Sequence, residues 1–391
     1  MIDSIYKGQF GKEVEALPDI LDLRASNLAG DLSVGEQDII KEKLAIEIDS
    51  NFRPFITKWN ITSGDVIELP TQTTTYSNYF RIDWGDGTIE NYTGSTNCTH
   101  TYATTGEFLV EIYGRLESWA GGSLSNNDTK LIEIVQWGDT EWKVIQFTKY
   151  YNLATLPVSE SPNLLKCITT PLFRYCALTS IPANIFATGR FITSFRQTFR
   201  NNAITAIPLG IFDNCFNAKS FEDMLAYNQI IDIPEDLFKY NINAINFNGS
   251  FSNNIIETVN SSIFDNNVNA ESFWGTFSSN SIIQFPTGIH KNNYRVKTFK
   301  EEFRYNTGIT GIADPLWNRF PVPEGKDFAQ YSETLDNFSD IPTYWGGTST
   351  LTYGKRISKH IWNGSQAEYD RMPQVWKDDV TFIKIVAGVI T

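Results

Sequence analysis

Histidine and cysteine are scarce in this chain, and their scarcity limits the chemistry that it can perform. The 391 residues include three histidines and four cysteines, and no two cysteines form a Cys-x-x-Cys pair. No Gly-x-Ser-x-Gly, P-loop or His-Glu-x-x-His sequence is present, so neither a nucleophile–base pair nor a metal site is indicated. We therefore predict a protein that is not an enzyme, takes no cofactor and keeps its cysteines free and buried.

Basic residues and long apolar runs are also in short supply. Lys and Arg number 32 against 45 Asp and Glu, so the formal net charge is −13, which argues against a groove for nucleic acid. No stretch reaches the ~18 consecutive apolar residues of a membrane-spanning helix. The first residues, Met1 to Lys7, lack the charged region and apolar run of a secretory signal. We expect neither nucleic acid nor a membrane as a partner.

Phenylalanine, by contrast, is abundant and recurs at a fixed step of 26 residues. The two clearest sets are Phe195, Phe221, Phe247, Phe273 and Phe299, and Asn202, Asn228, Asn254, Asn280 and Asn306. One unit cannot bury its aromatic face alone, so stacked units should form a spine of Phe and Ile, with the Asn side chains bonded to turn backbone. An extended segment should end at the Ile-Pro pair of each unit. The spacing around Phe221 permits either a helical turn or an extended chain.

One sequence motif runs from Leu178 to Pro182, continues with Ile185 and Phe186, and recurs at steps of 26 residues. It resembles the BspA-type leucine-rich repeats of bacterial surface proteins and of phages that infect such bacteria. The resemblance implies a solenoid, although this chain has Asn where that family often places Cys. The period is expected to fail after Asn306, and residues 341–347 look like a terminal cap.

Upstream of the repeats, two segments alternate like half-buried strands. Phe80, Ile82 and Trp84 precede the turn 85–87, and Phe108, Val110 and Ile112 alternate again after His100-Thr101-Tyr102. These segments resemble the PKD domain, an immunoglobulin-like sandwich with a Trp-Gly-Asp-Gly-Thr turn.

Three polar residues of this region, Asp83, Asp86 and His100, could suggest a metal or catalytic site. We instead interpret the acids as turn caps and the His-Thr-Tyr segment as a corner, because calcium needs six or more oxygen ligands. A second Trp-Gly-Asp, at 137–139, is expected to dock the sandwich onto the repeats.

The C-terminal region combines a strand, a Gly turn and a second strand. Ser365 and Glu368 form a capping box, which predicts a short helix after Ser365, and alternation from Val380 to Ile385 predicts a closing strand. The run from Ile361 to Asp370 resembles a terminal module of phage tail, fibre and head-decoration proteins. The resemblance implies a virion component.

Together these features predict a mainly β, multidomain protein with short helices. The expected parts are an N-terminal attachment or oligomerisation segment (1–51), a PKD-like β-sandwich (52–143), a repeat solenoid with its cap (144–349) and a phage-type module (350–391). We expect a structural or binding component of a bacteriophage particle, in head or tail, assembled in the host cytoplasm. Its partners would be other virion proteins, a host-surface glycan or protein, and further copies of itself in a dimer or trimer. The alternatives are a bacterial cell-surface adhesin and a polysaccharide-degrading tailspike.

A binding face is expected on the outside of the repeats. The candidate residues are Trp274, Asn228, Asn254 and Asn280. The acidic residues of the repeats do not recur at one position, so they are expected on a solvated face; they are Asp213, Glu222, Asp223, Asp232, Glu235 and Asp236. His290 replaces a spine Phe and is expected to be packed or to lie at the rim.

Overall fold

The computed structural model describes most of the chain between residues 53 and 336. The described ranges are 53–71, 79–93, 98–116, 118–119, 129–167, 173–318, 323–332 and 334–336, with the backbone of three strands beyond 359. The expected attachment segment 1–51, the cap at 341–347 and the helix after Ser365 lie outside them. Within them the protein is mainly β with almost no helix; one 3-10 helix is seen, Leu316–Asn318. None of the described helical structure is long and apolar enough to cross a bilayer.

The chain divides into two compact units, 1–167 and 168–391. The expected boundary between 143 and 144 lies earlier than this division. Within the first unit, residues 144–167 bond to β8 (Leu131–Gln136) through the backbone, since Ile134 donates to Thr155 at 3.0 Å, and ring contacts join residues 142–147 to the first strand. Trp142 and Phe147 lie 5.0 Å and 6.5 Å from Phe55, measured between ring centroids.

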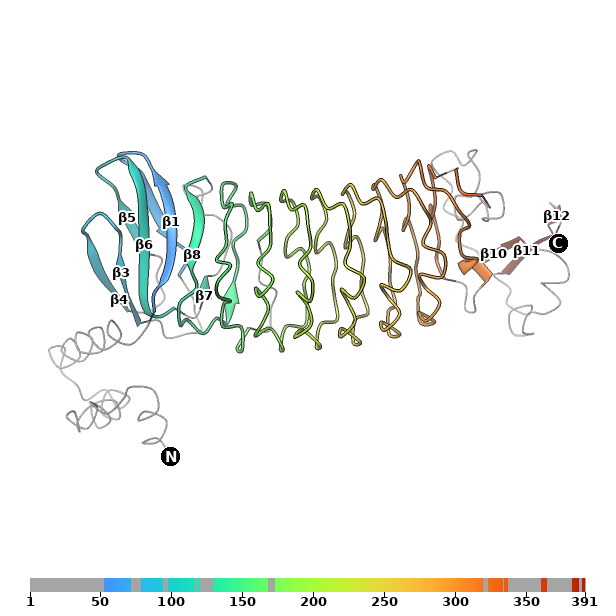
Figure 1. Ribbon diagram of the computed structural model, residues 1–391, viewed down its shortest axis with the longest axis horizontal. Coiled ribbons are helices and arrows are strands. Elements are labelled where there is room, and N and C mark those ends of the chain that lie inside the picture. Colours follow the sequence, from blue (N-terminus) through green and yellow to red (C-terminus); the bar gives the residue numbers. More distant parts are fainter. Residues whose placement is uncertain are drawn as a thin grey trace, which may run out of the picture. The chain divides into compact units, whose positions relative to one another are not determined.

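The first unit contains a five-stranded antiparallel sheet in the order β4-β3-β6-β1-β8 (Figure 1). Its strands are β1 (Phe55–Ile61), β3 (Tyr79–Asp83), β4 (Ile89–Thr93), β6 (Gly106–Arg115) and β8 (Leu131–Gln136). Two small sheets accompany it, an antiparallel pair of β2 (Val66–Leu69) and β5 (Cys98–Thr101), and a parallel pair of β7 (Ser118–Trp119) and β9 (Val144–Ile145).

Alternation along the strands explains which face of the sheet is buried. Every second residue of β1, from Phe55 to Ile61, is buried. Phe80, Ile82 and Trp84 are also buried, as their alternation predicted. The buried Thr57 accepts a hydrogen bond of 2.8 Å from the indole of Trp59, so the one polar group in this row has a partner.

The second unit contains a stack of 26-residue coils, which Figure 1 shows side by side. Backbone bonds join each coil to the next along one side, which we call the ladder face. It comprises residues 194–201, 220–227, 246–253, 272–279, 298–305 and 324–331. Every second residue there donates its N–H to the following coil, as Phe221 does to Asn246 and Asp223 to Asn248. The segment around Phe221 is thus neither an α-helix nor a regular strand.

Two columns of stacked rings fill the inside of the coils. In the first, successive ring centroids lie 5.4, 5.6, 5.3 and 5.9 Å apart, and the members are Phe195, Phe221, Phe247, Phe273 and Phe299. In the second, four Phe rings end on His290, which lies 5.9 Å from Phe264. All these rings are buried, so the predicted aromatic spine is confirmed.

The backbone repeats over most of the predicted solenoid, 144–349. Residues with positive φ recur every 26 positions, and they are Lys149, Tyr175, Asn201, Tyr227, Asn253, Ser279, Tyr305 and Tyr331. The side-chain period fails after Asn306, as Gly325 stands in the register of Phe299, but the backbone ladder continues, because Phe299 donates to Glu324 and Tyr305 to Gln330. A non-glycine residue at positive φ costs about 1–2 kcal/mol, so the inter-coil bonds must offset this cost in each coil.

A small sheet lies near the C-terminus. β10 (His360–Asn363) pairs in parallel with β11 (Phe382–Val386), which pairs antiparallel with β12 (Val389–Ile390). The two strands expected in this region are therefore present.

Candidate functional site

The turn between β3 and β4 gathers the three polar residues that could suggest a metal or catalytic site. The Asp83 carboxylate accepts the N–H of Gly85 at 2.9 Å, and that of Asp86 accepts the N–H of Thr88 at 3.0 Å. His100 lies 2.7 Å from Asp86 through Nε2. Both acids therefore cap the turn, as we predicted.

The aromatic residues around His100 fix the corner that the His-Thr-Tyr segment was expected to form. The His100 ring stacks on Trp84 at 4.9 Å, and the Tyr102 hydroxyl donates to the Trp84 carbonyl at 2.9 Å. Burial raises the pKa of Asp86, but hydrogen bonds from His100 and Thr88 outweigh it, and the net pKa lies below the ordinary value. The arrangement holds a turn in place and keeps the Asp86 carboxylate ionised.

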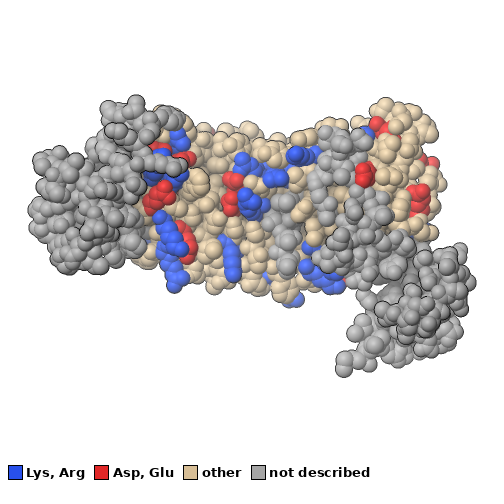
Figure 2. All heavy atoms as spheres, turned by 180° about the vertical axis from the view of Figure 1, so that it is seen from behind, with Lys and Arg blue, Asp and Glu red and all other residues tan. Residues whose placement is uncertain are grey.

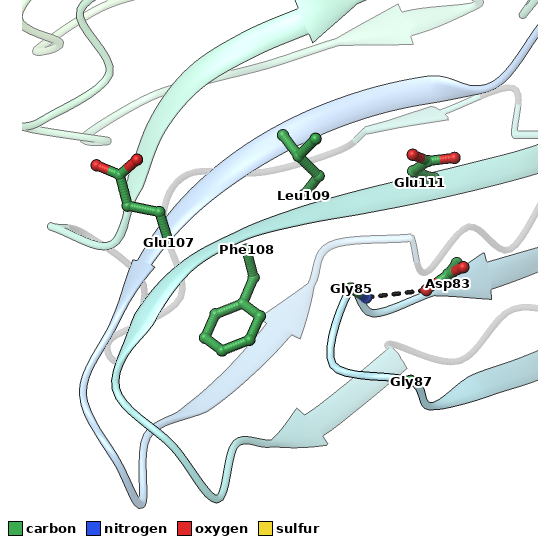
Figure 3. A pocket seen from close by; sticks show the side chains of 7 residues that line it. All are labelled: Asp83, Gly85, Gly87, Glu107, Phe108, Leu109 and Glu111. Carbon is green, nitrogen blue, oxygen red and sulfur yellow. Dashed lines mark hydrogen bonds between the residues drawn. The ribbon is translucent and has the colours of Figure 1, made fainter.

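A shallow hollow of about 430 Å³ lies beside this turn, between residues 83–87 and β6 (Figure 3). Three carboxylates line it, those of Asp83, Glu107 and Glu111. Glu107 forms an ion pair with Lys58 at 2.6 Å, and the Asp83 carboxylate accepts the hydrogen bond from the Gly85 N–H. Figure 3 shows the Glu107 side chain directed away from the turn. The hollow can accept hydrogen bonds through these carboxylates.

Glycine at position 85 is required by the closeness of β6. Its φ is +79°, and an added Cβ would lie 2.4 Å from the carbonyl oxygen of Leu109. The close approach of the Leu109 backbone thus explains why residue 85 is glycine. Within the described ranges, no group of three or more His, Cys, Asp or Glu side chains is placed to hold a metal ion.

The second Trp-Gly-Asp packs against the start of β1. The Trp137 ring is buried and stacks on Phe55 at 5.9 Å, and it lies 6.1 Å from Trp142. Asp139 accepts the backbone N–H of Arg53 at 2.8 Å. This segment joins the five-stranded sheet to residues 142–147 within the first unit.

The asparagines that close each unit form a ladder of side-chain hydrogen bonds inside the stack. We call Asn202, Asn228, Asn254, Asn280 and Asn306 the asparagine ladder. The amide of Asn228 donates to the carbonyls of Phe199 and Leu225 at 2.9 Å and 3.1 Å, and its Oδ1 accepts the N–H of Ile204 at 3.1 Å. These bonds confirm the predicted bonding to turn backbone.

The burial of the ladder asparagines contradicts the expectation that three of them form a binding face. Asn228, Asn254 and Asn280 are 3%, 7% and 9% exposed, and their amides are used by backbone groups of the same and neighbouring coils. A buried amide with these partners cannot reach a ligand outside the stack. Trp274 is 45% exposed, so of the four candidates it alone presents its side chain to solvent.

Two further asparagine rows were missed by the sequence pattern. Asn241, Asn267 and Asn293 each donate to two carbonyls of the preceding coil, as Asn267 does to Phe238 and Asn241. Asn217, Asn243 and Asn269 each donate to a carbonyl 27 residues earlier. The 26-residue step of these asparagines is visible in the sequence and could have indicated both rows.

His290 lies in the spine and is fully buried, so of the two expected places, packed or at the rim, it takes the packed one. Its Nε2 lies 2.7 Å from Glu302, and its Nδ1 lies 3.2 Å from Asn293. Both partners are also fully buried, so the three side chains form a polar group inside an apolar column. The acidic residues expected on a solvated face are indeed exposed or half-buried.

No protein family model matches the chain, and no curated protein is significantly similar to it.

Proposed function

We propose that this chain is a non-enzymatic structural and binding component of a bacteriophage particle, a fibre or decoration protein of head or tail. In this proposal the first unit contains a PKD-like sandwich, and the coils are a BspA-type leucine-rich-repeat solenoid. The solenoid presents its outer surface to a glycan or protein of the host surface. Other virion proteins anchor the chain, which assembles as a dimer or trimer.

One observation carries the binding role. One position that faces into the coils keeps a single residue type, whereas the position beside it, which faces out, changes from coil to coil. The inward position holds Phe in five successive coils, from Phe195 to Phe299. The next residue, which faces outward, is Arg196, Glu222, Asn248, Trp274 or Lys300 in the same coils. A scaffold needs the constant positions, and a recognition surface uses the variable ones.

The charge distribution supports a contact that is not purely electrostatic. Figure 2 shows a face on which most of the described surface carries no charge and Lys and Arg lie in separate groups. A surface for nucleic acid would instead concentrate positive charge.

The virion assignment rests on the resemblance of residues 361–370 to a phage terminal module. The parallel pair of β10 and β11 is consistent with a small independent module at this end. Peptide mass spectrometry of purified particles, with immunogold labelling by an antibody to this chain, tests the assignment. We expect the chain in particles together with capsid and tail proteins. Its absence from particles, with labelling of the bacterial envelope instead, would favour the adhesin.

A further inference from the structure

The ladder face changes character over two adjacent coils. Residues 246–253 and 272–279 contain no Lys, Arg, Asp or Glu, whereas every other segment of the ladder face contains at least two. We call these two segments the Trp274 platform. We propose that the Trp274 platform binds a neutral oligosaccharide, an inference that rests on the binding role proposed above and names its ligand class.

Trp274 supplies the apolar part of the platform. Its side chain is 45% exposed, and the Lys300 ammonium lies 4.3 Å from the ring centroid. This cation–π contact holds the indole on its neighbour. An indole fixed at the surface offers an apolar face with a polar N–H, which suits the C–H face and hydroxyl edge of a sugar ring.

The residues around Trp274 are short and polar. Asn248 Oδ1 accepts the backbone N–H of Trp274 at 3.1 Å and a hydrogen bond from the Ser272 hydroxyl, so it fixes the backbone beneath the indole. The half-buried polar side chains nearby are Asn246, Asn253, Ser278 and Ser279. Hydroxyl and amide groups both donate and accept hydrogen bonds, as sugar hydroxyls require.

The charges that border the platform are paired among themselves. On one side Arg200 forms an ion pair with Asp223 and lies 4.7 Å from the centroid of the Tyr227 ring. On the other side Glu301 lies 3.9 Å from Lys300 and 3.4 Å from Arg304. Each of these charges has an oppositely charged neighbour, and the two platform segments carry no charge of their own, so the platform fits a neutral glycan better than an anionic one.

The bordering coils also set the width of the site. Coils 220–227 and 298–305 are three steps apart, and at about 4.8 Å per step this gives about 14 Å. A short sugar chain can lie across the two uncharged coils within this width.

Glycine 275 allows the site to be filled without removing the indole. Its φ is +62°, and an added Cβ would meet only the Cβ of Ser278, at 3.9 Å. The equivalent position in another coil is Gln197, with φ of 61°, so the backbone accepts a glutamine there. Gly275→Gln should therefore place a side chain on the platform while the coil stays folded.

The test uses the labelled full-length protein on a printed array of neutral hexose and N-acetylhexosamine oligosaccharides beside uronic-acid and sialylated ones. Trp274→Ala and Gly275→Gln are compared with two controls away from the platform. Tyr294→Ala removes a 77% exposed aromatic residue, and Gly288→Gln adds a side chain at another glycine of positive φ in open space. Circular dichroism checks that each variant is folded.

We expect the wild type to retain at least one neutral oligosaccharide, and both platform variants to bind it at least about tenfold more weakly, as loss of an aromatic contact implies. Both controls should bind it as the wild type does. The proposal is overturned if no neutral glycan is retained, if only anionic glycans are, or if the platform variants bind normally. Mass spectrometry of particles tests the virion assignment independently of the array. If the chain is found in particles but binds no neutral glycan, the ligand class is refuted and the virion assignment stands.

Discussion

Removing one member of the asparagine ladder should destabilise the stack. Asn254 is 7% exposed, and its amide donates to the carbonyls of Leu225 and Phe251 at 2.9 Å and 3.1 Å. Its Oδ1 accepts the N–H of Ile230 at 3.0 Å. Asn254→Ala removes all of these bonds and leaves the Ile230 N–H, which is buried, without this acceptor.

The expected cost follows from these groups. A buried backbone donor left without a partner costs about 1–3 kcal/mol, and each further hydrogen bond contributes about 0.5–1.5 kcal/mol. The Leu225 carbonyl also accepts from Asn228 at 3.1 Å, so it keeps a partner. We therefore expect Asn254→Ala to lower the free energy of unfolding by about 3 kcal/mol. Asn266→Ala, at an exposed asparagine in the following coil, should change it by less than about 0.5 kcal/mol.

Two measurements test this prediction. Urea unfolding followed by circular dichroism gives the overall stability, but a stack of repeats need not unfold in one step. Native-state hydrogen exchange reads the effect locally, and the Ile230 amide should exchange much faster in Asn254→Ala than in Asn266→Ala. If that amide stays protected and both variants unfold at the same urea concentration, the ladder does not stabilise the coils as argued.

Three further predictions concern buried or paired titratable groups. His290→Phe alone removes the partner of Glu302 and should lower the free energy of unfolding by about 3–5 kcal/mol. Adding Glu302→Thr restores the residue types of the preceding coil and should recover most of this loss. Urea unfolding of the single and double variants tests both expectations. Asp86 has a folded-state pKa below its ordinary 3.8, so its stabilisation is present above that pH and is lost as the pH falls through the folded value. Calorimetry between pH 7 and 2 should therefore show a smaller fall in Tm for Asp86→Asn, and an equal fall would contradict the role given to His100. Burial raises the pKa of Cys215 to about 12, so its thiol should resist a disulfide reagent at pH 8 until denaturant is added. The stability that the protonated thiol contributes is lost only as the pH rises towards 12. Rapid labelling of Cys215 in the native protein would refute its burial.

The aromatic spine could be predicted from sequence because its signal lies in side chains. Phe195 and its four successors repeat one residue type, and only a stacked, buried position explains such constancy. The start of the coils does not show this constancy of side chains. Lys149 adopts the same positive φ as Tyr175 although its side chain differs, so the repeat is carried there by the backbone alone. At the other end Tyr331 keeps the residue type of Tyr305 and stacks on it at 4.8 Å.

The ladder asparagines show a different limit of the sequence. A recurring Asn can face outward to a ligand or inward to backbone carbonyls, and both arrangements give the same spacing. The structure decides between them, because Asn228 and Asn254 are buried and donate to several carbonyls each. The polar group of His290, Glu302 and Asn293 was not predicted, because a repeat pattern shows which residues depart from a column but not that their side chains meet.

The separation of inward and outward positions explains how one surface residue can differ so much from its neighbours. The backbone bonds of the ladder face are made by N–H and carbonyl groups, so they do not depend on which side chain points outward. Arg196, Glu222 and Trp274 therefore occupy equivalent places at little cost to the stack beneath them. Substitutions at these places should change binding far more than stability. Substitutions in the asparagine ladder or in the aromatic spine should change stability far more than binding. A Trp274→Ala protein that loses both glycan binding and several kcal/mol of stability would break this separation, because the indole would then be part of the scaffold that it is argued only to decorate.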